Sequence, residues 1–364
     1  MTLFATSPNP FPLHRLALSP LVSEDPLRAL ETVKETVRES EEQKFLDFLL
    51  QNGLGPLWHN TLKKNGVSSF FSPGFTDDLK QSRLLTTVQY LKQQHSLKKI
   101  ENIFRKNSLP HAVFKGAHIR EIIYNDPAVR PACDIDILVS KRYKARAINA
   151  LVAEELTFHP VAKNISHEAS LNDGNASIDL HWDILRPGRT RIDLTDAFLK
   201  ARKQFSDHWG FNNEAALFIM LVHPIFTKYG TAPQASLVRM VDLVRWVQTQ
   251  QIDWDKTHNW LKQGGVQTAA WITGKWLKML TGISLPESFM HSIKPGRART
   301  LYLRQWLDRN PSSRLIDYPT FIQAGFTLPA HDTFTDALHA VISQIREKRM
   351  AEENLNKLIS STNL

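Results

Sequence analysis

The chain has 364 residues, 42% of them hydrophobic, with a formal net charge of +9 at pH 7, which predicts two or three globular domains. Its longest uninterrupted apolar run, Ala215 to Val222, is too short to cross a bilayer, and the N-terminus predicts no secretory signal, so we expect no membrane contact. One cysteine, Cys133, excludes a disulfide framework or a multi-cysteine zinc site within the chain and favours a reducing cytoplasm.

Residues 1–107 are expected to form an N-terminal helical region. Asp25 followed by Pro26 predicts a helix start, because aspartate caps free backbone N–H groups and proline fits the first helical position. A second helix is predicted from Asp77 to Lys106. Its expected apolar stripe contains Leu84, Val88, Leu91, Ile100 and Phe104.

Residues 108–205 change character and predict a mixed α/β core. Short strands are expected at His111–Phe114 and Asp134–Val139, with a turn into a helix at Lys115 and another helix from Lys141 to Leu156. The segment from Glu168 to Trp182 reads as a hairpin around Asp173-Gly174.

Residues 206–364 predict a C-terminal helical domain, since four segments carry apolar residues at helical spacing. Breaks are expected at Pro224, Pro233, Gly264-Gly265 and Pro286. The predicted fold class is therefore α+β: a small mixed β-sheet core flanked by N- and C-terminal helical regions.

Two carboxylates stand one residue apart in the stretch RPACDIDILVS. Side chains alternate along a strand, so Asp134 and Asp136 point to one face while Ile135 points to the other. Two adjacent anions repel each other and require a cation. A solvated strand end is the alternative interpretation of the same pair.

Two further segments supply matching groups. In SIDLHW, Asp179 and His181 share one strand face. In FKGAH, Gly116 at a strand-to-helix turn allows a phosphate to approach backbone N–H groups. Lys115 beside it offers a charge that can bind a phosphate. Together these groups predict phosphoryl or nucleotidyl transfer on magnesium. The alternatives are a core Asp179 paired with Arg189 or Arg191 and a structural His181.

The stretches FKGAHIREIIYNDPAVRPACDIDILVS and IDLHWDI resemble the uncharacterised nucleotidyltransferase family within the DNA polymerase beta-like superfamily, over roughly residues 80–290. The resemblance implies a minimal nucleotidyltransferase sheet, Mg²⁺ or Mn²⁺, and transfer of a nucleoside monophosphate from an NTP with release of pyrophosphate. By position, Asp134, Asp136 and Asp179 would be the catalytic metal ligands. Lys115 and Gly116 stand where the wider superfamily has Gly-Ser, so Lys115 would replace a phosphate-binding serine.

Some residues keep two interpretations. Arg130 is either a phosphate or acceptor contact or a loop charge, and His181 is either a hydrogen-bonding partner of a carboxylate or nucleotide or a structural residue. His223 and Asp242 are expected to form a buried polar pair or a cap, because an unpaired buried charge is costly. Cys133 receives no role.

The partners expected are an NTP and an unidentified acceptor, which would be a small molecule, a peptide or a protein. Two other functions stay open: a non-catalytic nucleotide-binding or scaffold protein, and a nucleic-acid-binding protein that uses the basic stretch 294–314. That stretch holds six basic residues against the single acid Asp308. A solvated loop and helix face is the favoured interpretation of this stretch, and no nucleic-acid-binding module is recognised.

Overall fold

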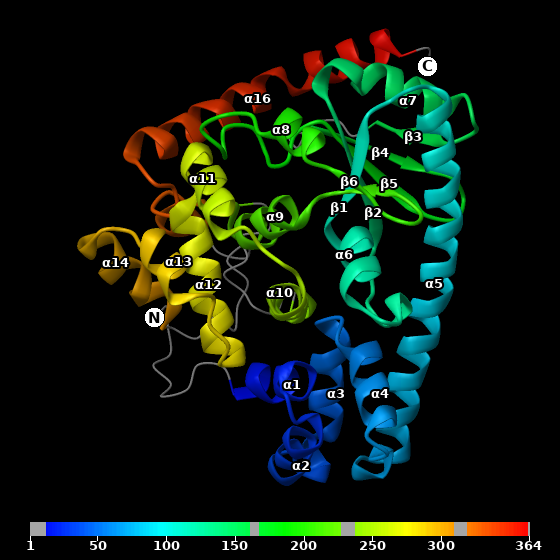
Figure 1. Ribbon diagram of the computed structural model, residues 1–364, viewed down its shortest axis with the longest axis vertical. Helices are drawn as coiled ribbons and strands as arrows, with labels where there is room; N and C mark the ends of the chain where they lie inside the picture. The colour runs from blue at the N-terminus through cyan, green and yellow to red at the C-terminus, as the bar shows by residue number, and fades with distance from the viewer. Residues whose placement is uncertain (1–11, 161–166, 227–236, 309–318, 363–364) are drawn as a thin grey trace.

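The computed structural model describes residues 12–160, 167–226, 237–308 and 319–362. In Figure 1 the mixed sheet lies at the upper right, with the helices α1 to α4 below it and most of the C-terminal helices to its left, and the predicted α+β class is confirmed. The long helix α5 (Pro73–Lys106) runs along the side of both the N-terminal helices and the sheet. Among the described residues, no helix combines the length and the apolar character needed to cross a membrane.

The N-terminal region contains α1 (Pro12–Val22), α2 (Pro26–Thr36), α3 (Glu42–Gln51), α4 (Gly55–Lys64) and α5. The strands are β1 (His111–Phe114), β2 (Asp134–Val139), β3 (Thr157–His159), β4 (Glu168–Asn172), β5 (Ser177–His181), β6 (Lys203–Gln204) and β7 (Trp209–Gly210). Helices α6 (Lys115–Ile123), α7 (Lys144–Val152) and α8 (Thr195–Lys200) connect them. The C-terminal helices are α9 (Asn213–Phe226), α10 (Leu237–Thr249), α11 (Trp254–Gly264), α12 (Gln267–Thr281), α13 (Glu287–Ser292), α14 (Arg297–Leu307), α15 (Thr320–Thr327) and α16 (Phe334–Ser361).

The seven strands follow the order β3-β4-β5-β2-β1-β7-β6. β2 pairs with β5 in parallel, and β1 pairs with β7 in parallel, whereas the other neighbours are antiparallel. The predicted strands at 111–114 and 134–139 and the hairpin around Gly174 are present. The short strand β7 extends the sheet beyond residue 205, where the sequence placed the end of the core; that division into domains stays a prediction.

The two faces of the sheet have different surroundings. Ile135 and Ile137 of β2 and Leu180 of β5 belong to an apolar cluster that also contains residues of α5 and α7. Because side chains alternate, the carboxylates of β2 and β5 point to the opposite face. That face looks toward α6, α9 and α10.

The start of α2 is confirmed, because the Asp25 side chain accepts a hydrogen bond from the Arg28 amide and Pro26 is the first helical residue. The stripe expected on α5 is only partly buried. Ile100 and Phe104 are buried, but Leu84, Val88 and Leu91 are exposed.

A polar side chain is also buried on α5. Gln93 is buried there; it donates to the Ala132 carbonyl (2.9 Å) and accepts from Arg120 (2.6 Å). The inner face of α5 therefore combines apolar packing under the sheet, through Ile100 and Phe104, with hydrogen bonds at Gln93.

Two predicted helix boundaries are wrong. The helix expected up to Leu156 ends at Val152, because Glu155 takes a left-handed conformation (φ +68°) and the Leu156 amide bonds back to the Leu151 carbonyl. Pro224 does not break its helix: α9 continues to Phe226, and the proline removes one amide near its end. The break at Gly264-Gly265 is confirmed, with Gly265 at φ +69°, and Pro286 precedes α13. Pro233 lies outside the described residues.

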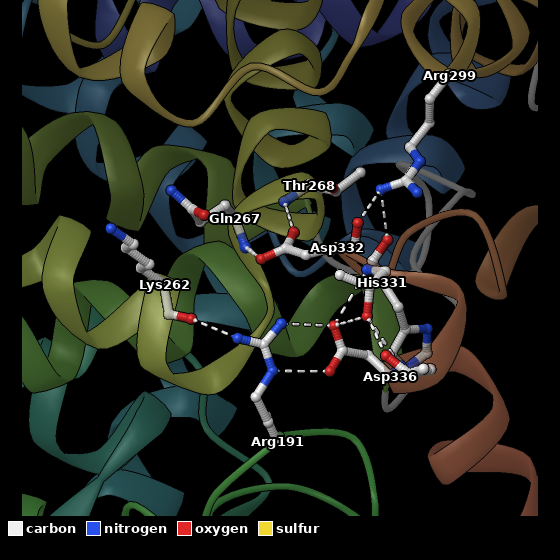
Figure 2. Close-up of polar contacts among 10 residues, drawn as sticks. Arg191, Lys262, Gln267, Thr268, Arg299, His331, Asp332 and Asp336 are labelled. Atoms are coloured by element: carbon white, nitrogen blue, oxygen red, sulfur yellow. Dashed lines mark hydrogen bonds and ion pairs between the residues drawn. The ribbon is translucent and has the colours of Figure 1, made fainter.

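Figure 2 shows how the segment before α16 is fastened to the rest of the chain. Asp332 accepts from the backbone amides of Gln267 (3.0 Å) and Thr268 (2.7 Å) at the start of α12. Asp336 accepts two hydrogen bonds from Arg191, at 2.9 and 2.8 Å, and forms a capping box with Thr333. We call these contacts of Asp332 and Asp336 the α16 clasp.

One residue of the basic stretch belongs to the clasp region. Arg299 donates to the carbonyl oxygens of His331 and Asp332, so its charge serves a structural contact. Arg309 and Arg314 lie outside the described residues.

Replacing Asp336 by alanine is expected to loosen α16, because the change removes both the Arg191 pair and the helix cap. The expected cost is about 1–3 kcal/mol in the opening of this segment. Amide hydrogen exchange over the first turns of α16 measures it. Glu353→Ala, which removes the exposed pair with Lys357, is the control and should leave exchange unchanged. Unchanged protection in Asp336→Ala would show that the clasp does not hold the helix.

Candidate functional site

The parallel pairing of β2 with β5 sets Asp136 directly beside Asp179. Paired residues on neighbouring parallel strands point to the same face, so the two carboxylates are side by side. His181, two residues after Asp179, shares this face. Ligand atoms of Asp136, Asp179 and His181 all lie within 4.8 Å of one another. The structure thus brings together three of the residues that the sequence selected.

This group differs from the predicted set of metal ligands. The sequence named Asp134, Asp136 and Asp179, whereas the compact group in the described part of the chain contains His181 in place of Asp134. Asp134 is partly buried and lines the same cavity, two residues before Asp136 on β2. Its carboxylate is therefore near the group, and its role as a ligand stays a prediction.

Lys115 and His181 hold the Asp136 carboxylate between them. The Lys115 ammonium lies 2.6 Å from Asp136 Oδ1, and His181 Nε2 lies 2.8 Å from the same oxygen. Burial by itself would raise the pKa of Asp136, but the Lys115 charge and the His181 hydrogen bond outweigh it and keep this pKa well below its ordinary value. Asp136 is therefore an anion at neutral pH although it is 4% exposed.

A second layer of side chains orients these groups. Glu168 Oε2 lies 3.2 Å from His181 Nδ1, and the Ser170 hydroxyl donates to Asp179 Oδ1 at 2.9 Å. Burial raises the pKa of Glu168, while the nearby His181 acts against that change. Glu168 and Ser170 were not selected from the sequence. Their alternation in the hairpin strand opposite Asp179 and His181 was the available signal.

The Lys-Gly turn is built without a connecting loop, since β1 ends at Phe114 and α6 begins at Lys115. This abrupt change requires a left-handed backbone at Lys115 (φ +56°), which is uncommon for a residue with a side chain. Gly116 follows because a Cβ there would collide with the Arg130 guanidinium. The turn aims Lys115 across the sheet at Asp136.

Arg130 is committed to a buried ion pair. Its Nε and NH2 atoms donate to Asp242, the shortest contact being 2.6 Å, and its NH1 atom donates to the Pro131 carbonyl at 2.6 Å. Tyr124 donates to the same carboxylate at 2.7 Å. Although burial opposes it, the Asp242 charge raises the pKa of Arg130. Arg130 therefore supports the Lys-Gly turn from behind, and direct contact with a phosphate stays a prediction.

His223 and Asp242 are both buried, as expected, but each has a different partner. His223 Nδ1 lies 3.2 Å from Arg239 NH1, whereas Asp242 binds Arg130 and Tyr124. Asp179 is likewise not paired with Arg191, which binds Asp336. The sequence did not select Arg239, because an arginine in a helix carries no pattern that separates a buried charge from a solvated one.

Lys115, the three residues of the metal group and Arg239 line one cavity of about 560 Å³. Its walls come from the sheet, the Lys-Gly turn of α6, the end of α3, and the helices α9 and α10. This volume is within the range of small-molecule sites. The exposed Cys133 also lies on its lining.

A comparison with protein families matches the uncharacterised nucleotidyltransferase family over residues 38–281. The chain belongs to this family. The match begins earlier than the likeness seen in the sequence and includes α3, α4 and the whole cavity lining, from Leu50 to Asp242. A search of curated proteins finds no match. Membership supports a nucleotidyltransferase activity in general terms, and the Asp136, Asp179 and His181 group is compatible with a metal site.

Gly116→Ala is expected to destabilise the fold by about 1–3 kcal/mol, because the Arg130 guanidinium that it meets is fixed by Asp242 and cannot move aside. Equilibrium denaturation in urea measures the change. The matched control is Gly74→Ala in α5, where an added Cβ has nothing within 4 Å. Equal stability of the two variants would show that Arg130 is free to shift.

Proposed function

We propose that this protein transfers a nucleoside monophosphate from an NTP to an acceptor hydroxyl or phosphate, with release of pyrophosphate and with Mg²⁺ or Mn²⁺ as the metal. The observation that carries the proposal is the group of Asp136, Asp179 and His181 facing a cavity beside Lys115. Its occurrence in a chain of a nucleotidyltransferase family supports the reaction class.

The donor set fits a divalent metal ion. Asp136 and Asp179 supply the hard oxygen ligands that Mg²⁺ prefers, and Asp134 stands on the same strand face as Asp136. The depressed pKa of Asp136, set by Lys115 and His181 against the effect of burial, keeps this ligand charged. We propose that Asp134, Asp136 and Asp179 hold the metal, with His181 beside them. A bound metal would neutralise charge on the phosphates and on the leaving pyrophosphate.

The protein's own groups then bind and orient the reactants. The first turn of α6, which begins at Lys115, offers a phosphate backbone amides that have no helical partner. Lys115, whose ammonium group is paired with Asp136, is a cation that can also contact a phosphate oxygen. Ser170 fixes one oxygen of Asp179, and we assign the other to the hydroxyl of the acceptor.

The proposed partners are the NTP and an acceptor that is a small molecule, a peptide or a protein, and the proposed compartment is the cytoplasm, from the single cysteine. The flanking helices α3, α9 and α10, which line the cavity, would then shape the acceptor site.

Asp136→Asn is expected to lower pyrophosphate release by at least about 1000-fold, because the neutral amide loses the anion that the metal and Lys115 require. The assay supplies Mg²⁺ and each labelled NTP in turn and follows both pyrophosphate and label transfer. Asp196→Asn, an exposed carboxylate at the start of α8, is the matched control and should behave as wild type. Turnover that persists in Asp136→Asn would remove this strand from the mechanism. Nucleotide binding without any bond cleavage in the wild type would support the non-catalytic alternative.

Removal of divalent metal is expected to abolish transfer, and its return to restore it. Mg²⁺ or Mn²⁺ should also raise the Tm of the wild type, since a ligand that binds only the folded state stabilises it. The double variant Asp136→Asn/Asp179→Asn should show no such rise. An equal rise in wild type and double variant would place the metal elsewhere on the chain.

A further inference from the structure

The cations that line the cavity fall into two classes. Lys115 is paired with Asp136, and Arg130 is paired with Asp242. Arg186 and Arg239 also line the cavity, but in the part of the chain that the structure describes neither forms an ion pair. Both are only partly exposed. A guanidinium keeps its charge under all ordinary conditions, so two charges here have no acid of their own.

Arg239 projects from α10 into the cavity. Its NH1 atom lies 3.2 Å from His223 Nδ1, and since arginine only donates, this ring nitrogen is the acceptor. Burial lowers the pKa of Arg239 and the charge of Arg130 adds to that effect, while Asp136, Asp242 and Asp134 act against it. The charges of Asp136 and Asp134 therefore act on Arg239, while its hydrogen bond goes to His223.

Arg186 reaches the cavity from the segment after β5, five residues beyond His181. Its Nε atom is buried and has no hydrogen-bond partner. A buried donor that makes no hydrogen bond is unfavourable, so a ligand that supplies an acceptor to this side chain removes that penalty.

We propose that Arg239, together with Arg186, binds the polyphosphate arm of the nucleotide. The inference rests on the proposed function and names the residues that recognise the β- and γ-phosphates. Phosphate oxygens supply what both arginines lack, namely negative charge and acceptors that match a planar guanidinium. The sheet side of the cavity then carries the metal-binding acids, and α10 carries a positive charge for the phosphates.

The alternative cation, Arg130, is less suited to this task. Its Nε, NH1 and NH2 atoms are already donors to Asp242 and to the Pro131 carbonyl. Moving it away from Asp242 would leave a buried carboxylate without its cation, which is strongly unfavourable. Arg239 gives up only a contact with a neutral ring.

The test measures binding of Mg²⁺-NTP and of inorganic tripolyphosphate, which has no base or sugar, by titration calorimetry on the full chain. Arg239→Met is expected to lower the affinity for tripolyphosphate and for NTP by about 10- to 100-fold, the range for one charge-assisted contact. The affinity for a nucleoside monophosphate should fall much less. Arg186→Met is expected to show a loss of about 10-fold on the same probes.

Two further variants keep the test decisive. Arg239→Gln retains an N–H donor for His223 and removes only the charge, so it should lose affinity even if Arg239→Met folds poorly. Arg245→Met is the matched control on the same helix: Arg245 stacks on Tyr124 and lies outside the cavity lining, and affinity should stay within about twofold of wild type. Thermal unfolding of each variant reports whether it is folded.

Wild-type affinity for tripolyphosphate in folded Arg239→Gln, or no binding of tripolyphosphate by the wild type, would overturn the inference. Binding that is lost in the Arg239 variants while no transfer is ever detected would uphold it and refute the proposed transferase reaction instead.

Discussion

The carboxylates of Asp136 and Asp179 stand side by side because β2 and β5 are parallel and in register. Two anions at this separation, one of them almost fully buried, repel each other in a medium that screens charge poorly. Lys115 and His181 offset the charge of Asp136, and Ser170 donates to Asp179. Much of the surrounding structure serves to put those compensating groups in place.

The buried ion pair of Arg130 and Asp242 lies behind the Lys-Gly turn and supports it. Arg130 fills the space that a side chain at residue 116 would need, so the glycine of the turn and the buried arginine depend on each other. Asp242 belongs to α10, the helix that also carries Arg239. One ion pair therefore fixes the position of α10 relative to the Lys-Gly turn, and with it the distance between the acidic and basic sides of the cavity.

The family match and the cavity coincide along the chain. All residues that line the cavity lie between Leu50 and Asp242, inside the matched range of 38–281. The helices α13 to α16 lie beyond that range and are held in part through the α16 clasp, which joins Asp332 and Asp336 to α12 and to Arg191. The group that performs the proposed chemistry is thus separate in sequence from α13 to α16, which pack on the core through apolar residues such as Phe289, Leu303 and Phe326 as well as through the clasp.

The sequence by itself determined the elements whose signals are local. Alternation of side chains placed Asp134 and Asp136 on one face, and Asp25 with Pro26 marked the start of α2, because caps and strand periods depend on neighbours a few residues apart. The α+β class followed from the change in periodicity along the chain. The burial of Gln93 on α5 could not be read in this way, since its partners Ala132 and Arg120 are distant in the chain, and the end of α7 and the continuation of α9 through Pro224 were also missed.

Only the tertiary structure decided which charges have partners. Asp242 binds Arg130 across 112 residues and Asp336 binds Arg191 across 145, and no pattern within either segment announces such a contact. For the same reason the sequence offered Arg130 as the phosphate contact, while the fold leaves Arg239 and Arg186 as the cavity arginines without an ion pair among the described residues. The chemistry of a side chain determines which partners it can bind, and the folded chain determines which of those partners lie within its reach.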